Sequence, residues 1–242
     1  MNKNETSQTS GMPEEWQAEG KKKTKIVCLG DSITEGFGLG AEENYPVLLG
    51  RRLGGEYEIM NAGVTAHCVT DETAPDGRTI GLPYMRTEKY AAGIAAQGDI
   101  YVLLLGTNDA QDGLFDDGSA VDPYFNVFGQ REHFIRHYER ILSDVRRANP
   151  AARIYVCRPV PILNCIWPKH QQKYLDVILD KLDEIGRRNP DVRILDLFSA
   201  FRSKGDAWLK SVYQADGLHP GPEGAAFLAE LVADRLAEDA RG

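Results

Sequence analysis

The residues best suited to covalent chemistry stand where apolar segments of the chain end. Residues 26–29 form an apolar, β-branched run of strand length that stops at Gly30 and is followed by Asp31 and Ser32. A hydroxyl on the loop after a parallel strand lies at the carboxyl edge of the sheet, where open α/β folds bind their ligands. Ser32 is therefore the candidate nucleophile. Taken alone, however, the stretch favours a helix cap, because short Gly-x-Ser strings are common by chance.

A serine nucleophile needs a base, and the chain offers five histidines. His219 follows the last predicted strand and stands three residues after Asp216. A carboxylate at that spacing in a tight loop can accept from the imidazole Nδ1 and leave Nε2 free to take a proton from a serine. The alternative is a plain turn at the start of a helix. His133 and His137 are expected on a solvated helical face, because no third metal ligand stands near them.

An oxyanion hole requires hydrogen-bond donors aimed at a carbonyl oxygen as it becomes negative. Gly63 ends the segment 61–63 after the second predicted strand, and Asn108 lies in the segment 106–109 after the third. The main-chain N–H groups of Ser32 and Gly63, together with the Asn108 amide, would supply three donors, and a glycine permits close backbone approach. The alternatives are an Asx-turn at Asn108 and a left-handed turn at Gly63.

These residues need a scaffold that brings separate loops to one place. Five strand-length segments alternate with helical ones, which predicts an α/β protein, a three-layer α/β/α sandwich with right-handed crossovers. A flavodoxin-like parallel sheet of order 2-1-3-4-5 would make the loops bearing Ser32, Gly63 and Asn108 neighbours. The predicted strands cover residues 26–29, 57–60, 99–105, 153–157 and 192–197, and the predicted helices cover residues 44–53, 86–97, 130–148, 170–188 and 222–240.

Length and composition suit one globular domain. The 242 residues can bury a large core without disulfides or metal, and 42% hydrophobic with 26% charged residues is ordinary for such a domain. Residues 1–20 are polar, with almost no core formers, and are expected to be a disordered leader before a single catalytic domain over residues 21–242. Residues 64–83 and 110–129 lack a helical period and are expected to be irregular segments near the site.

The net charge and the cysteines limit the classes of partner and the cellular location that are expected. A net charge of -8 argues against a nucleic-acid surface and leaves small neutral substrates open. No apolar run approaches the roughly eighteen residues of a membrane-spanning helix, and the N-terminus has no apolar signal segment. Cys28 and Cys157 fall inside predicted strands without any Cys-x-x-Cys spacing, so a reduced, cytoplasmic location is expected. No metal or organic cofactor is expected, and a homo-oligomer stays open.

Four short motifs, in this order along the chain, resemble the conserved blocks of the GDSL/SGNH hydrolases. They are Gly30-Asp31-Ser32, Gly63 in Asn61-Ala62-Gly63, Gly106-Thr107-Asn108-Asp109, and Asp216-x-x-His219. The resemblance spans about residues 25–237, and the coincidence of four weak motifs makes it specific. Two positions depart from the pattern: Ile33 replaces the Leu of the family's name, and residues 65–66 are Thr-Ala where members often have Ser-Gly.

The resemblance implies a serine esterase and assigns its parts. Ser32 would be the nucleophile and form the acyl-enzyme, Asp216 and His219 would complete the triad, and Ser32, Gly63 and Asn108 would form the oxyanion hole. The substrate would be a small-molecule ester bearing a short acyl group, acetyl above all, on a carbohydrate.

Other, less specific segments indicate which branch of the family the chain resembles. Residues 159–161 and 213–224 look most like the carbohydrate acetylesterase and sialate O-acetylesterase branch, whereas residues 36–53 are also similar to the lysophospholipase and arylesterase branch. The alternatives are thus a lysophospholipase, arylesterase or thioesterase, and a catalytically silent carbohydrate-binding domain on the same fold. The candidates for stacking on a sugar are Trp167, Tyr84, Tyr124 and Phe125.

Overall fold

The structure is a computed structural model that describes residues 22–73, 77, 79–111, 131–167 and 170–241. Its centre is a five-stranded parallel sheet in the order β2-β1-β5-β6-β7. The strands are β1 (Thr24–Gly30), β2 (Tyr57–Gly63), β5 (Ile100–Leu104), β6 (Arg153–Arg158) and β7 (Val192–Asp196). Counted among these five strands alone, the order is the predicted 2-1-3-4-5. The expected leader over residues 1–20 lies outside the described residues.

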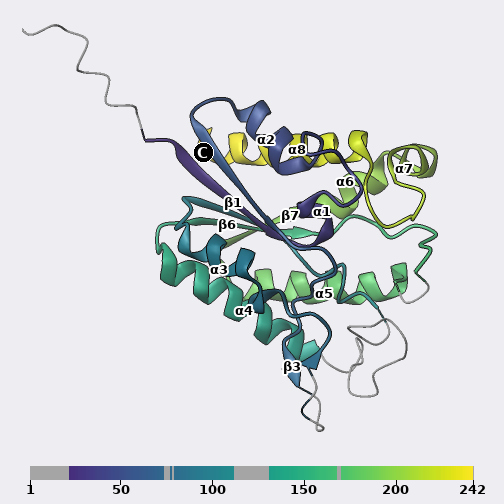
Figure 1. Cartoon of the computed structure of the whole chain (residues 1–242), viewed down its shortest axis with the longest axis horizontal. Helices are drawn as coiled ribbons and strands as arrows, with labels where there is room; N and C mark the ends of the chain where they lie inside the picture. The colour runs from purple at the N-terminus through teal and green to yellow at the C-terminus, as the bar shows by residue number, and fades with distance from the viewer. Residues whose placement is uncertain (1–21, 74–76, 78, 112–130, 168–169, 242) are drawn as a thin grey trace, which may run out of the picture.

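Helices cover both faces of the sheet, as Figure 1 shows, so the predicted three-layer sandwich is confirmed. One face packs against α3 (Glu88–Ala95), α4 (Arg131–Ala148) and α5 (Gln172–Arg188). The other face packs against α2 (Tyr45–Leu53), α6 (Leu197–Ser203), α7 (Asp206–Val212) and α8 (Pro222–Arg241).

The side chains of β1 pack into the cores on both faces of the sheet. Val27 and Leu29 belong to the core under α3, α4 and α5, whereas Ile26 and Cys28 belong to the core under α2 and α8. This alternation follows from the two-residue period of a strand. Because a central parallel strand is covered on both sides, every residue of β5 is apolar and buried.

The sequence patterns that predict the long helices and strands do not predict the short ones. The antiparallel pair β3 (Glu72–Thr73) and β4 (Thr79–Ile80), the 3-10 turn η2 (Tyr84–Arg86), α6 and α7 were not predicted. Seven residues in α6 are too few to establish a helical period, and its start is fixed locally by Asp196, whose side chain accepts from the N–H of Ser199.

The ends of the central strands place three loops at one edge of the sheet, where the site lies. Gly30 at the end of β1 pairs with Gly63 of β2 and with Leu104 of β5, so the three following loops leave the sheet at one edge. Beneath that edge, Cys28 and Cys157 are buried free thiols. No helix in the described ranges is long and apolar enough to cross a membrane, and no group of three or more His, Cys, Asp or Glu within those ranges is arranged to hold a metal ion.

Candidate active site

The turn after β1 places Ser32 at the first position of α1 (Ser32–Glu35). Asp31 is the N-cap, and its Oδ1 accepts from the N–H of Ile33 at 3.0 Å. Gly36 ends the helix at φ 93°, a left-handed conformation that favours glycine, and its N–H returns to the Ser32 carbonyl. Asp31 thus caps the helix, while the Ser32 side chain is left for another partner.

That partner is His219, and the structure brings the two residues together across 187 positions of sequence. The imidazole Nε2 lies 2.8 Å from Ser32 Oγ, and Nδ1 lies 2.8 Å from Asp216 Oδ2. Since a carboxylate only accepts, Nδ1 donates the hydrogen bond, which leaves the Nε2 lone pair for the hydroxyl. This is the tautomer in which an imidazole can take a proton from a serine.

Asp216 is held by its own loop. Its Oδ1 accepts from the N–H groups of Leu218 at 2.8 Å and His219 at 2.9 Å. Burial raises the pKa of this carboxyl, but the hydrogen bonds from His219 and Leu218 outweigh burial, and the net pKa lies below the ordinary value. The carboxylate is therefore charged at neutral pH and oriented toward Nδ1.

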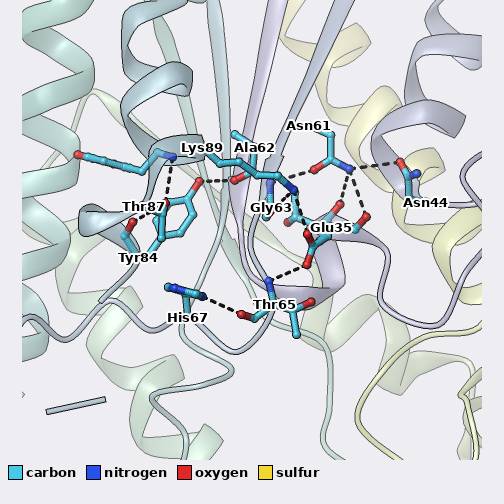
Figure 2. A network of polar contacts seen from close by, with 12 residues as sticks. Glu35, Asn44, Asn61, Ala62, Gly63, Thr65, His67, Tyr84, Thr87 and Lys89 are labelled. Carbon is cyan, nitrogen blue, oxygen red and sulfur yellow. Dashed lines mark hydrogen bonds and ion pairs between the residues drawn. The ribbon is translucent and has the colours of Figure 1, made fainter. Parts of the chain in front are cut away.

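Gly63 does not fit the role of oxyanion donor expected from the sequence. Its N–H donates to Asn61 Oδ1 at 2.9 Å, as Figure 2 shows, and Gly63 is not among the residues that line the cavity at Ser32. A Cβ at this position would lie 2.2 Å from the main-chain nitrogen of Glu35. A glycine is needed here because α1 approaches the end of β2 closely, and not because its N–H faces a ligand.

Ala66 lies at the cavity, where a donor from Gly63 was expected. It is exposed, has a left-handed φ of 64° and lines the same cavity as Ser32 and Asn108. Among the described residues its N–H has no hydrogen-bond partner. The missed signal was the Thr-Ala pair at 65–66, which stands where the resembled family often has Ser-Gly.

Asn108 reaches the cavity from the loop after β5. Its Nδ2 donates one hydrogen to the His67 carbonyl at 3.0 Å, and the amide nitrogen has a second hydrogen to offer. Its neighbour Asp109 is buried and accepts from the N–H groups of Val69 at 2.9 Å and Thr70 at 3.0 Å. The Asn108 loop is thereby tied to the loop after β2.

The cavity has a volume of about 220 Å³ and an aromatic rim. Phe37 is 41% exposed and Trp167 is 38% exposed. Their rings lie on the imidazole of His219, with centroid distances of 4.6 Å for Phe37 and 5.8 Å for Trp167. The lining residues are Ser32, Phe37, Thr65, Ala66, Asn108, Trp167, His170, Leu218 and His219.

Two further aromatic predictions fall elsewhere. Tyr84 is fully buried, and its hydroxyl donates to the Ala62 carbonyl at 2.6 Å, so it belongs to the core and not to the mouth of the site. Tyr124 and Phe125 lie outside the described residues. Of the four aromatic candidates, the structure places Trp167 at the cavity.

The remaining histidines lie in different surroundings. His67 is absent from the cavity lining, and its Nδ1 lies 2.7 Å from the Thr65 carbonyl. His137 is 7% exposed and accepts from the N–H of Asp71, so it is packed against the chain instead of facing solvent. His170, which the sequence did not single out, lines the cavity.

The chain is similar to known proteins over most of its length. The chain matches the model of the GDSL-like Lipase/Acylhydrolase family over residues 28–227. It is 27% identical over 215 residues to a protein named acetylxylan esterase from Xylanibacter ruminicola. That match covers 86% of this chain and 42% of the relative, so the chain spans less than half of the relative's length.

Solved structures share the fold at low sequence identity. A lipase/acylhydrolase from Enterococcus faecalis superposes with a TM-score of 0.61 at 21% identity, over 88% of this chain and 95% of that one. A carbohydrate acetylesterase from Sinorhizobium meliloti superposes with a TM-score of 0.64 at 17% identity, over 89% of this chain and 99% of that one.

Proposed function

The chain belongs to the GDSL-like Lipase/Acylhydrolase family, and from that membership we propose that it is a serine esterase that removes short acyl groups, acetyl above all, from a carbohydrate. The observation that carries the proposal is the hydrogen-bonded series from Ser32 Oγ through His219 to Asp216 at the wall of the cavity. The acetylxylan esterase relative supports an acetyl ester and a carbohydrate alcohol.

In this proposal Ser32 Oγ attacks the ester carbonyl while its proton passes to Nε2 of His219. Asp216 accepts from Nδ1 and stabilises the imidazolium that forms. The tetrahedral intermediate collapses when His219 gives the proton to the alcohol oxygen. The bond between that oxygen and the carbonyl carbon then breaks, so the alcohol departs and the acyl group stays on Ser32. Water then attacks the acyl-enzyme with His219 as base, and the carboxylic acid departs as Ser32 recovers its proton.

Three donors would stabilise the negative oxygen of both tetrahedral intermediates. We assign them to the N–H of Ser32, the Nδ2 of Asn108 and, in place of Gly63, the N–H of Ala66. Ser32 stands first in α1, so its N–H has no partner within that helix. Donors of this kind contribute on the order of 10²–10³ each to the rate when they are aimed at the oxyanion.

The cavity suits a short acyl group on a ring-shaped alcohol. Its volume of about 220 Å³ is below the 300–1,000 Å³ typical of sites for drug-sized ligands. The exposed rings of Phe37 and Trp167 both contact His219, the residue that would give a proton to the leaving alcohol. Flat aromatic faces at that position favour a pyranose ring over a flexible chain.

Substitution of the nucleophile tests the reaction type. Ser32→Ala should lower kcat for p-nitrophenyl acetate by about 10⁴-fold or more, and a fluorophosphonate should no longer label the protein. The fold should survive, because Asp31 and not Ser32 caps α1. Ser211→Ala is the matched control, since this hydroxyl is exposed and donates to the Trp208 carbonyl within its own helix. Turnover retained in Ser32→Ala, or a wild-type protein that resists the fluorophosphonate, would exclude the proposal.

Acyl length and the nature of the alcohol test the substrate. Acetylated xylan oligosaccharides and p-nitrophenyl acetate should be cleaved with higher kcat/KM than p-nitrophenyl octanoate. A preference for octanoyl would instead identify a lipolytic esterase. Tight binding of the oligosaccharide without any cleavage would identify a silent carbohydrate-binding domain.

A further inference from the structure

A polar network joins the nucleophile turn to the loop after β2, as Figure 2 shows. Glu35, the last residue of α1, uses both carboxylate oxygens. Its Oε2 accepts from the N–H of Thr65 at 2.8 Å, and its Oε1 accepts from Lys89 Nζ at 2.9 Å. Lys89, on α3, also donates to the Gly63 carbonyl at 2.8 Å. One ion pair therefore holds both ends of the segment 63–65.

The same segment is fixed at nearly every other polar group. The Val64 N–H donates to the Gly30 carbonyl at 3.0 Å, and the Thr65 carbonyl accepts from His67 Nδ1 at 2.7 Å. In a trans peptide the carbonyl and the next N–H point in opposite directions. Because His67 holds the Thr65 oxygen on one side, the Ala66 N–H of the same peptide plane is turned to the other side.

The ion pair between Glu35 and Lys89 contributes little to folding stability. The side chain of Lys89 is 48% exposed and that of Glu35 is 36% exposed. Exposed pairs of this kind contribute about 0–1 kcal/mol to folding. What distinguishes this pair is its location, since Glu35 binds the residue just before Ala66 and lies three positions after Ser32.

We propose that Glu35 and Lys89 are positioning residues that hold the main-chain N–H of Ala66 at the oxyanion site. This inference rests on the proposed esterase function. Glu35 is part of the helix that begins with Ser32, so its side chain links the Thr65 N–H, and through Lys89 the Gly63 carbonyl, directly to that helix. A donor displaced by about 1 Å can cost up to 10²-fold in rate.

Conservative variants of the pair test the inference. Glu35→Gln keeps the shape but places an amide donor against either Lys89 or Thr65, and Lys89→Met removes the ammonium. Each should lower kcat for p-nitrophenyl acetate by about 10- to 100-fold and leave KM within twofold, because acylation and deacylation both pass through the oxyanion. The double variant should lose no more than the worse single variant, since both act through one unit.

An exposed ion pair of the same kind provides the matched control. Arg52 on α2 and Glu230 on α8 lie 3.1 Å apart, with side chains 48% and 43% exposed. Glu230→Gln should keep kcat within twofold of wild type. Melting temperatures of Glu35→Gln, Lys89→Met and Glu230→Gln should fall by similar small amounts, which would separate positioning from stability.

The outcomes distinguish this inference from the function on which it rests. If wild type hydrolyses the ester and is labelled at Ser32, but Glu35→Gln and Lys89→Met retain its kcat, the positioning role is excluded and the esterase stands. A rise in KM at constant kcat, or an equal loss in Glu230→Gln, would also exclude it. If wild type neither cleaves the ester nor reacts at Ser32, both proposals fail together.

Discussion

Asp216→Asn is the substitution whose effect follows most directly from the structure. Asp216 Oδ1 accepts from two main-chain N–H groups, at 2.8 and 2.9 Å, and Oδ2 faces His219 Nδ1 at 2.8 Å. An asparagine can keep the two main-chain bonds through its single oxygen. Its amide then faces Nδ1 as a donor, and the imidazole must accept at Nδ1 and carry its proton on Nε2. That tautomer has no lone pair for Ser32.

The expected loss in kcat for p-nitrophenyl acetate is about 10³- to 10⁴-fold, or roughly 4–5.5 kcal/mol in the activation free energy. Circular dichroism and melting should remain close to wild type, because the variant keeps the main-chain bonds. Asp206→Asn is the control, since that carboxylate is 84% exposed at the start of α7. If Asp216→Asn retained more than about a tenth of the wild-type kcat, the tautomer argument would be wrong.

Three further predictions concern a buried carboxyl, a strained turn and the aromatic rim. Burial raises the pKa of Asp31 to about 7, so the contribution of this carboxyl to folding stability should fall as the pH rises from about 4 to 7. The free energy of unfolding of Asp31→Asn relative to wild type should therefore rise over that window by up to about 4 kcal/mol, measured by urea unfolding at pH 4.5 and 7.5. A constant difference between the two pH values would contradict this. Ala66→Gly should raise the free energy of unfolding by a few tenths to about 1 kcal/mol, because the left-handed φ of 64° no longer strains a Cβ; a destabilised variant would refute the assignment of strain. Trp167→Ala should raise KM about fivefold to tenfold for an acetylated oligosaccharide but less than twofold for ethyl acetate; equal effects on both substrates would argue against stacking.

Much of the fold could be predicted because each long element carries its own pattern. The apolar run of β5 reports burial on both faces, and Asn44 with Pro46 marks the start of α2, where the Asn44 side chain accepts from Val47. The Asp216 and His219 pair was predictable for the same reason, since its geometry lies within one loop.

The loop after β2 shows what a single sequence does not reveal. Glycine was expected to be the donor because it permits close approach, but at Gly63 the close approach is to α1, a contact fixed only by the packing of two elements. The residue that adopts the left-handed conformation is an alanine, whose type gives no local signal. Glu35 and Lys89 are 54 residues apart and become partners only through the tertiary fold.

The hydrogen bond between Ser32 and His219 has a consequence for how the chain can be studied while it folds. All five strands of the sheet precede His219, and α8, which follows it, packs in the same core as α2 beside the nucleophile turn. A partly refolded chain can thus hold native sheet structure and still have an unreactive Ser32. A short pulse of fluorophosphonate during refolding would therefore count the molecules in which His219 has reached Ser32.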